Sequence, residues 1–488
     1  MPSNLPTELV ELVLDHVYWA DCGPPTDYET HFDLSQAKHD TLSACSLVSR
    51  SWLPRTRIHL FSIIELDSSD GSITVFLGLL QHPLCTITNY VRDLTFRDGR
   101  RWADPYYQSD PYHREDWHGS HLLTLTCLLS IENLKFYNVS FQSAALGVDG
   151  AHTFFAAFPC LKSLWLGDCT FDTKTHFLKM ISSISLLENL SLASVDCTRN
   201  TFKLSTKNWR QERRGRAVFP RPPSPDRSDD EDLVPPPPAN LKTLCFYSEG
   251  PGIQELTAWL SSGSSTPALH TLFCEPILNQ TAVPLASYIQ TLGDSLRHLL
   301  VNVSHEFPNT IPVVDFLNTV DLSIHKNLES IGFYFIQLDS NNIPHPADYT
   351  YHLLNQITSP HMKEIWIRVV VKSLEDLNRL DWNELQRILA KPCFRNLERL
   401  VISDVHNLPE SMVSDIRQLI ATKIPMLASR KAIHVYSREG VIAQMIPSRA
   451  LGLQRLPCST DLEARWRVLE DIQEARLRYS DADDFSLF

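Results

Sequence analysis

The sequence lacks the features that mark secreted, membrane-bound or nucleic-acid-binding proteins. Its N-terminus has no charged start followed by an apolar core, as a signal peptide has, and no run approaches the roughly 18 apolar residues that span a bilayer. The formal net charge is −13, and no basic stripe with interleaved aromatic residues offers a nucleic-acid surface. We therefore expect an intracellular protein, cytoplasmic or nuclear, that binds neither membranes nor nucleic acid.

Motifs that carry chemistry are absent as well. There is no Gly-x-x-x-x-Gly-Lys phosphate loop, no His-Glu-x-x-His pair and no Gly-x-Ser-x-Gly elbow. The sequence thus predicts no catalytic residue, no metal ligands and no cofactor, and we expect a chain that is not an enzyme. A catalytic triad built from distant residues leaves no local trace, so a hydrolase on an α/β sheet stays open as an alternative.

The cysteines point to a reducing compartment. The sequence has 11 of them and no Cys-x-x-Cys pair. Several lie within apolar segments, where a free thiol packs as a small hydrophobic side chain. We therefore expect buried thiols at Cys127, Cys160, Cys245 and Cys274.

The N-terminal stretch NLPTELVELVLDHVYW predicts a helix that starts near Thr7. Pro6 suits the opening turn of a helix, and Glu8 favours the positive end of its dipole. An exposed terminal helix needs only one apolar stripe. This helix has more than one, formed by Leu9, Val10, Leu12, Val13, Leu14 and Val17.

The stretch LSACSLVSRSWLPRTRIHLF predicts one or two further short helices, which Pro54 separates or kinks. Fewer than seventy residues can bury only part of this apolar surface among themselves, so we expect a partner to cover the rest. A purely internal core is the alternative. Arg50, Arg55 and Arg57 form a basic patch suited to an acidic partner, or are ordinary solvated side chains. The apolar positions at helical spacing are Leu42, Cys45, Val48 and Trp52, followed by Ile58, Leu60 and Phe61.

These two stretches together resemble the F-box, in particular that of fungal proteins. The resemblance rests on the Leu-Pro-x-Glu-Leu opening from Leu5, the spacing of Val48, Arg50 and Trp52, and the closing Leu60-Phe61. One departure is a loop insert at residues 20–38. The family implies binding to a Skp-type adaptor and, through it, to a cullin scaffold. The residues that it implies as adaptor contacts are Leu5, Pro6, Glu8, Leu9, Val13, Leu42, Val48, Arg50, Trp52, Leu60 and Phe61.

A weak repeat follows, in which leucine-like residues alternate as in a buried strand. Amphipathic stretches of helical period lie between the copies, so stacked strand and helix units are expected. We predict an α/β fold in which a short all-helical segment precedes a solenoid with parallel strands lining one concave side. The copies are VRDLTF, IENLKF, CLKSLWL, LLENLSL, NLKTLCF, ALHTLFC, SLRHLLV, NLESIGF, HMKEIWI, NLERLVI and KAIHVYS.

This repeat resembles the leucine-rich repeat in an irregular form, and an F-box followed by such repeats is a known family layout. The asparagine that often closes the strand motif is mostly absent, and Asp168, Tyr334 and Asp404 stand at equivalent places. An ordinary two-layer α/β sheet is the alternative. The expected parts are an F-box at 1–64, a repeat solenoid at 65–440, and a C-terminal capping helix with an acidic tail at 441–488.

A proline-rich and charged insert at about 205–238 is expected to be disordered and to lengthen one repeat without breaking the stack. Its Ser224 and Ser228 resemble kinase sites, and Arg210 to Arg216 resemble a nuclear import signal. A solvated and unmodified linker is the simpler interpretation.

The resemblance to the F-box and to leucine-rich repeats implies the substrate receptor of a Skp/cullin/F-box ubiquitin ligase. The alternative is a scaffold that binds the adaptor but acts outside a cullin ligase. The protein target cannot be named from the sequence, because the exposed repeat positions share no chemical theme. Candidate target contacts are the strand residues Lys135, Trp165, Lys242, Tyr334 and Trp366.

Overall fold

The fold is known from a computed structural model of residues 1–488. The residues that it describes form two compact units. One contains the N-terminal helices up to Leu60 together with the described residues of 403–413 and Tyr436, and the other contains the described residues of 61–402 and 414–435. The described ranges are 7–20, 40–68, 71–98, 120–141, 150–197, 234–247, 252–262, 268–275, 279–302, 311–338, 346–370, 374–404 and 410–436.

The N-terminal unit is helical, as the sequence predicts. Helix α1 (Thr7–Ala20) begins at the expected residue. A second helix covers 40–48, and α3 (Leu53–Phe61) follows with Pro54 in its first turn, where proline costs no hydrogen bond. The predicted insert at 20–38 lies outside the described residues except for Ala20, the last residue of α1. The predicted capping helix and tail at 441–488 lie outside them entirely.

The second unit, called the sheet unit here, is built on 12 strands that succeed one another in chain order. From β1 to β12 every pair of neighbours is parallel. A doubly wound sheet would reverse its strand order at a switch point, so the order is that of an α/β solenoid. The strands are β1 (Ile63–Asp67), β2 (Asp93–Arg97), β3 (Asn133–Tyr137), β4 (Ser163–Gly167), β6 (Asn189–Ala193), β8 (Thr243–Tyr247), β9 (Thr271–Glu275), β10 (His298–Asn302), β11 (Ser330–Gln337), β12 (Glu364–Val370), β13 (Arg399–Asp404) and β14 (Ile433–Tyr436).

All eleven predicted strand motifs form strands, from β2 to β14. Three strands were not expected. The motif search missed β1, which extends the sheet at its N-terminal end. It also missed β5 (Thr170–Phe171) and β7 (Asp196–Cys197), which pair with each other in a small separate sheet.

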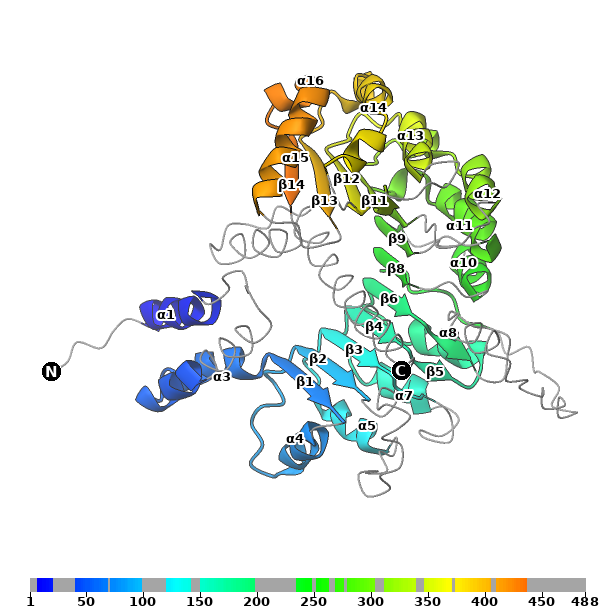
Figure 1. Ribbon diagram of the computed structural model, residues 1–488. Helices are drawn as coiled ribbons and strands as arrows, with labels where there is room; N and C mark the ends of the chain where they lie inside the picture. The colour runs from blue at the N-terminus through cyan, green and yellow to red at the C-terminus, as the bar shows by residue number, and fades with distance from the viewer. Residues whose placement is uncertain are drawn as a thin grey trace, which may run out of the picture. The chain divides into compact units, whose positions relative to one another are not determined.

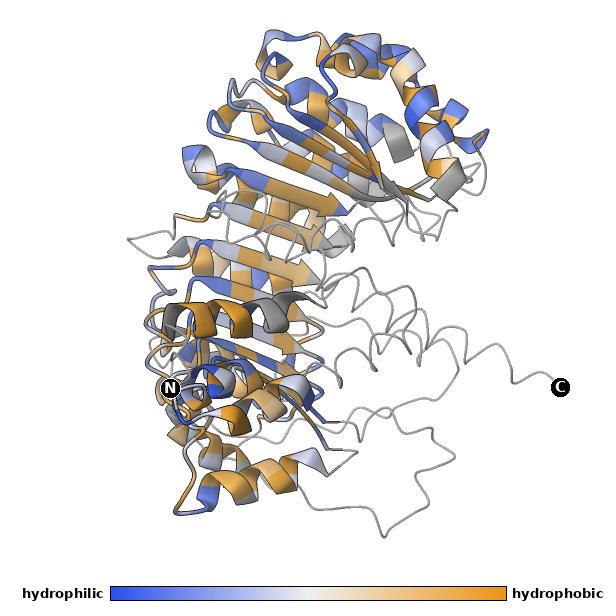
Figure 2. Ribbon diagram, turned by 90° about the vertical axis from the view of Figure 1, so that its left-hand side faces the viewer, coloured by the Kyte–Doolittle hydropathy of each residue, from blue (hydrophilic) through white to orange (hydrophobic). Residues whose placement is uncertain are grey.

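Helices line one side of the sheet, as Figure 1 shows for those from α10 to α14. In the strands from β1 to β13 the second and fourth residues face them: Phe136, the fourth residue of β3, is fully buried and lies against the rings of Phe154 and Phe155 in α7. Figure 2 shows how hydrophobic residues dominate the strands. The helices are α4 (Ser72–Gln81), α5 (Ser120–Thr124), α7 (Gly150–Ala156), α8 (Lys174–Ser182), α10 (Gly252–Ser262), α11 (Asn279–Leu292), α12 (Ile311–Thr319), α13 (Pro346–Gln356), α14 (Trp382–Leu389), α15 (Glu410–Lys423) and α16 (Pro425–Ser429).

None of the helices among the described residues combines the length and the hydropathy needed to cross a lipid bilayer.

The other face of the sheet carries the first and third residues of the strands from β1 to β13. From β2 on, these residues do not show the exposed side chains that alternation of buried and exposed positions predicts. Trp165 and Trp366 were predicted to be exposed, but both are buried, with exposed fractions of 4% and 3%. The prediction was wrong because the third positions are themselves largely apolar and pack on this face. Of the other candidates, Lys135 is half-buried, and Lys242 is exposed but precedes β8 instead of lying in a strand. The side chain of Tyr334 lies outside the described part of the structure. Further buried third-position residues are Cys245, Phe273, Leu300 and Val401.

The end of the predicted disordered insert is ordered. Residues 234–238 are described, and Pro237 and Pro238 are buried. The Ser182 hydroxyl of α8 donates to the Pro236 carbonyl, and the Trp259 indole of α10 donates to the Pro235 carbonyl. A proline segment has no backbone N–H groups to satisfy but keeps free carbonyl acceptors, which these two side chains use. Residues 205–233 lie outside the described part of the chain.

Four cysteines were predicted to be buried, and the structure confirms this for two of them. Cys245 and Cys274 are buried, and burial raises the pKa of the Cys274 thiol. Cys127 is exposed and Cys160 is half-buried, so the prediction was wrong for both. Cys127 ends the short 3-10 helix Leu125–Cys127, and Cys160 lies in the turn before β4, so neither stands within a strand, which explains the difference.

A polar turn closes the first strands in place of an asparagine ladder. The N–H groups of Ser68, Asp98, Asn138 and Asp168 each donate to the last strand carbonyl of the following repeat. Asn138 and Asp168 adopt φ values of 61° and 54°, a left-handed conformation that short polar residues tolerate. Asp168 therefore performs the backbone role of an asparagine at this position.

Candidate interaction surfaces

Helix α1 has two apolar stripes with different surroundings. Val10 and Leu14, four residues apart, are 4% and 0% exposed and form the core of the N-terminal unit. Leu9, Leu12 and Val13 have the spacing of a second stripe and are 48%, 65% and 46% exposed. A helix packed on one face only would carry polar residues on the second stripe. The second stripe is therefore available to a partner.

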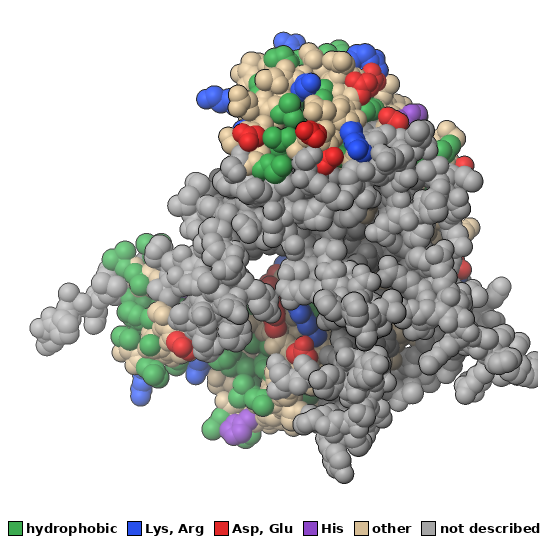
Figure 3. Space-filling view, in the orientation of Figure 1, with side chains coloured by type: hydrophobic (Ala, Val, Ile, Leu, Met, Phe, Trp, Pro, Cys, Tyr) green, Lys and Arg blue, Asp and Glu red, His purple; other side chains and the backbone are tan. Residues whose placement is uncertain are grey.

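The other two helices of this unit also expose apolar side chains. Leu47 and Val48, at the end of the helix over 40–48, are 86% and 65% exposed, and Ile58 of α3 is 37% exposed. In Figure 3, hydrophobic side chains gather on the visible surface around α1 and α3. We call Leu9, Leu12, Val13, Leu47, Val48 and Ile58 the N-terminal apolar set.

The eleven residues that the F-box resemblance implies as adaptor contacts are not in one environment. Leu5 and Pro6 lie outside the described residues, and Glu8 lies in α1 with its side chain undescribed. Leu9, Val13, Val48 and Arg50 are exposed, whereas Leu42 is buried within the unit. Trp52, Leu60 and Phe61 are partly buried.

Three exposed members of the N-terminal apolar set, Leu12, Leu47 and Ile58, were not among the expected contacts. Leu12 and Leu47 each stand beside an expected contact, Val13 or Val48. Helical spacing was the available signal, because Leu12 lies three residues after Leu9.

A charged group ties α1 to α3. The Arg55 guanidinium donates two hydrogen bonds to the Asp15 carboxylate, Nε to Oδ1 at 2.7 Å and Nη2 to Oδ2 at 2.6 Å. His59 Nε2 lies 2.7 Å from Asp15 Oδ1. A planar guanidinium paired with both oxygens fixes the orientation of the two helices. Arg55 is therefore a structural residue of this unit, a role that its place in the basic patch did not indicate.

The stability of this unit is expected to depend on pH through Asp15. Burial alone raises the pKa of the Asp15 carboxyl, but the hydrogen bonds and charges of Arg55 and His59 outweigh it and hold the pKa below its ordinary value. A depressed pKa in the folded state adds stability above the unfolded value, about 3.9, which is lost as pH falls through the folded value. Amide hydrogen exchange of α1 should show protection that falls in acid.

The matched control is an Asp15→Asn variant, in which this titration is removed. Its α1 protection should be lower at neutral pH and should change less between pH 7 and pH 3, after correction for intrinsic exchange rates. Equal pH dependence in the natural chain and the variant would contradict the assignment.

The sheet unit carries a second polar feature at the edge where its strands begin. From β1 to β12, the carbonyl of the residue just before each strand accepts hydrogen bonds from the first two N–H groups of the next repeat. These residues alternate in charge over much of the sheet. We call this series the edge ladder, which consists of Arg92, Glu132, Lys162, Glu188, Lys242, His270, Arg297, Glu329, Lys363 and Glu398.

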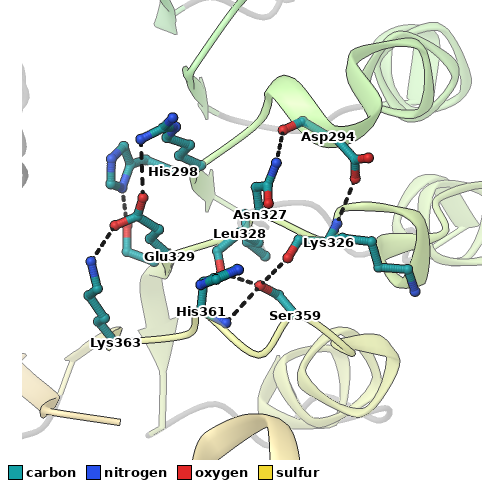
Figure 4. Close-up of polar contacts among 11 residues, drawn as sticks. Asp294, His298, Lys326, Asn327, Leu328, Glu329, Ser359, His361 and Lys363 are labelled. Carbon is teal, nitrogen blue, oxygen red and sulfur yellow. Dashed lines mark hydrogen bonds and ion pairs between the residues drawn. The ribbon is translucent and has the colours of Figure 1, made fainter. Parts of the chain in front are cut away.

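Within the edge ladder, carboxylates bridge cations on both sides. Glu132 lies 3.5 Å from Arg92 and 2.9 Å from Lys162. Glu329 lies 3.4 Å from Arg297 and 2.7 Å from Lys363 (Figure 4). Burial alone raises the pKa of Glu329, but Lys363, His298 and Arg297 outweigh it and lower the pKa below its ordinary value. The ladder is thus a row of ion pairs that run across the strands.

Side chains of the turns reinforce the same edge. The Asn327 amide donates to the Asp294 carbonyl at 2.9 Å, and the fully buried Ser359 hydroxyl donates to the carbonyls of Lys326 and Leu328 (Figure 4). Asn240 and Asn396 make the equivalent bond to the preceding repeat. The asparagine of the Asn-Leu-x-x-Leu motifs therefore acts before the strand.

The chain was compared with known proteins. A scan against protein-family models finds no match, and a search of curated proteins also finds no match.

Proposed function

We propose that this chain is the substrate-receptor subunit of a Skp/cullin/F-box ubiquitin ligase. Its N-terminal helices bind a Skp-type adaptor, and its leucine-rich-repeat-like sheet unit binds a protein target. The observation that carries the proposal is the second apolar stripe of α1, where Leu9, Leu12 and Val13 remain exposed beside a packed core. In this proposal the protein acts inside the cell, in the cytoplasm or the nucleus.

The energetics of the N-terminal apolar set favour a protein partner. Complete burial of one such side chain contributes about 1.5–3 kcal/mol. Several exposed at once on a small unit are unusual for a monomer and typical of a docking surface. The Leu-Pro-x-Glu-Leu opening and the Val48, Arg50, Trp52 spacing favour a Skp-type adaptor as this partner, since both resemble the F-box.

The sheet unit suits a receptor that has no chemistry of its own. A stack of repeats offers a long surface whose exposed residues vary freely, because each repeat is stabilised by its neighbours. A receptor of this kind acts by proximity: a target held on it presents its lysines to the ubiquitin-charged enzyme at raised effective concentration. The catalytic groups then belong to the partners.

Co-purification of the adaptor and cullin with the full chain tests this function. A Leu9→Asp variant places a charge on the exposed stripe and leaves the core residues Val10 and Leu14 in place. It should weaken adaptor binding about a hundredfold, which corresponds to about 2.7 kcal/mol. Val75→Asp is the matched control, because Val75 is 75% exposed on α4 of the sheet unit, and it should bind like the natural chain.

The partners recovered distinguish the alternatives. Recovery of adaptor without cullin would favour the scaffold function outside a cullin ligase. Recovery of neither partner by the natural chain would refute both functions, and equal binding by Leu9→Asp would refute the role of α1.

A further inference from the structure

The edge ladder has one place where its alternation of charge fails. Elsewhere a glutamate stands between two cations: Glu132 between Arg92 and Lys162, and Glu329 between Arg297 and Lys363. Between Lys242 and Arg297 the ladder holds His270 instead. The His270 N–H donates to the Lys242 carbonyl, and the Arg297 N–H donates to the His270 carbonyl, so the three residues are direct neighbours.

The three side chains around this break form a positive and accessible spot. Lys242 and Arg297 each retain a half-exposed side chain and pair with one carboxylate on their far side, Glu188 at 2.9 Å and Glu329 at 3.4 Å. Among the described residues the His270 ring has no hydrogen-bond partner. The pKa of His270 lies below its ordinary value, chiefly because of burial and further because of the charges of Arg297 and Lys242.

We propose that this break is a docking site for an acidic segment of the target protein, which places a glutamate or aspartate carboxylate over His270 between Lys242 and Arg297. The inference names the target chemistry for the proposed receptor, and it rests on that proposed function.

The ladder itself indicates a carboxylate. Neighbouring strands lie about 4.8 Å apart, so one carboxylate above the middle strand reaches cations on both flanking strands. Glu132 and Glu329 perform this bridge with their own side chains. At His270 the chain has the two flanking cations, Lys242 and Arg297, but no carboxylate between them. A glutamate or aspartate of a partner would supply this carboxylate and bridge the two cations in the same way. His270 can add a third hydrogen bond as a donor.

A fluorescence anisotropy titration of the full chain with a labelled tetraglutamate peptide tests the site. Tetraglutamate should bind, and tetraglutamine should not. A His270→Glu variant completes the ladder with its own carboxylate, so it should lose at least tenfold in affinity for tetraglutamate. The same variant should raise the melting temperature, because it adds a bridging ion pair. A higher melting temperature would show that the variant loses affinity because its own carboxylate occupies the site, and not because the fold is damaged.

Two further variants make the result specific. His152→Glu, on an exposed residue of α7 outside the ladder, is the charge-matched control and should bind tetraglutamate like the natural chain. Lys242→Gln should lose at least tenfold in affinity and provides a second route if His270→Glu does not fold.

Three results would overturn the inference. They are equal binding of the glutamate and glutamine peptides, binding that His270→Glu and Lys242→Gln leave unchanged, or an equal loss with His152→Glu. A phosphoserine peptide of the same net charge that binds more than tenfold tighter would overturn the choice of a carboxylate. Adaptor binding plays no part in this titration, so its outcome is independent of the co-purification that tests the receptor function.

Discussion

Replacement of Phe136 by alanine is expected to lower the free energy of unfolding of the sheet unit by about 3–5 kcal/mol. The Phe136 side chain is fully buried. Its ring centroid lies 5.9 Å from that of Phe96, 5.1 Å from Phe141, 6.0 Å from Phe154 and 5.8 Å from Phe155. Aromatic pairs at these separations add to the energy of burial, so the cavity would remove several contacts at once.

Chemical denaturation of the full chain, followed by near-ultraviolet circular dichroism, measures this effect. Leu129→Ala is the control, because Leu129 lies in the turn before β3 and is 55% exposed. It should change stability by no more than about 0.5 kcal/mol. A Phe136→Ala chain as stable as the Leu129→Ala chain would show that the aromatic cluster does not support the sheet unit.

Leu14→Ala is expected to unfold the N-terminal unit. Leu14 is fully buried, and its truncation costs about 2–5 kcal/mol. A helical unit this small has little stability to lose, since small domains bury a low fraction of their surface. Adaptor binding would then be lost through unfolding, whereas Leu9→Asp loses it with the unit folded. The two stripes of α1 are thereby separated by experiment.

Hydrogen exchange of the α1 and α3 amides distinguishes these two outcomes. Protection should disappear in Leu14→Ala and persist in Leu9→Asp. Leu12→Ala is the matched control for truncation, because Leu12 is 65% exposed in the same helix, and its protection should equal that of the natural chain. Retained protection in Leu14→Ala would mean that the stripe of Val10 and Leu14 is not the core.

The strands could be predicted from the sequence because their pattern is local. Each motif sets two leucine-like residues two apart on the face that packs against helices, and this produced all eleven motif strands, from β2 to β14. The strand β1 was not predicted, because Ile63 and Ile64 are adjacent apolar residues without a preceding leucine motif. The strands β5 and β7 have two residues each, too few for any periodicity.

The edge ladder could not be predicted, because it depends on register. Arg92 and Glu132 are 40 positions apart in the chain, and only parallel pairing brings Asp93 opposite Asn133 and so sets the preceding residues side by side. The burial of Trp165 and Trp366 depends in the same way on neighbours in other repeats. For the N-terminal unit the sequence indicated an excess of apolar residues, but only the fold separates the buried Val10 from the exposed Leu9.

The register of the sheet is independent of the length of chain between its strands. The link from β6 to β8 is longer than the link from β4 to β6, yet Glu188 accepts from Lys242 and Thr243 just as Lys162 accepts from Glu188 and Asn189. Evolution can therefore lengthen or replace a single connection while every strand keeps its partner. New surface can arise in one repeat at a time, without cost to the stack that holds it.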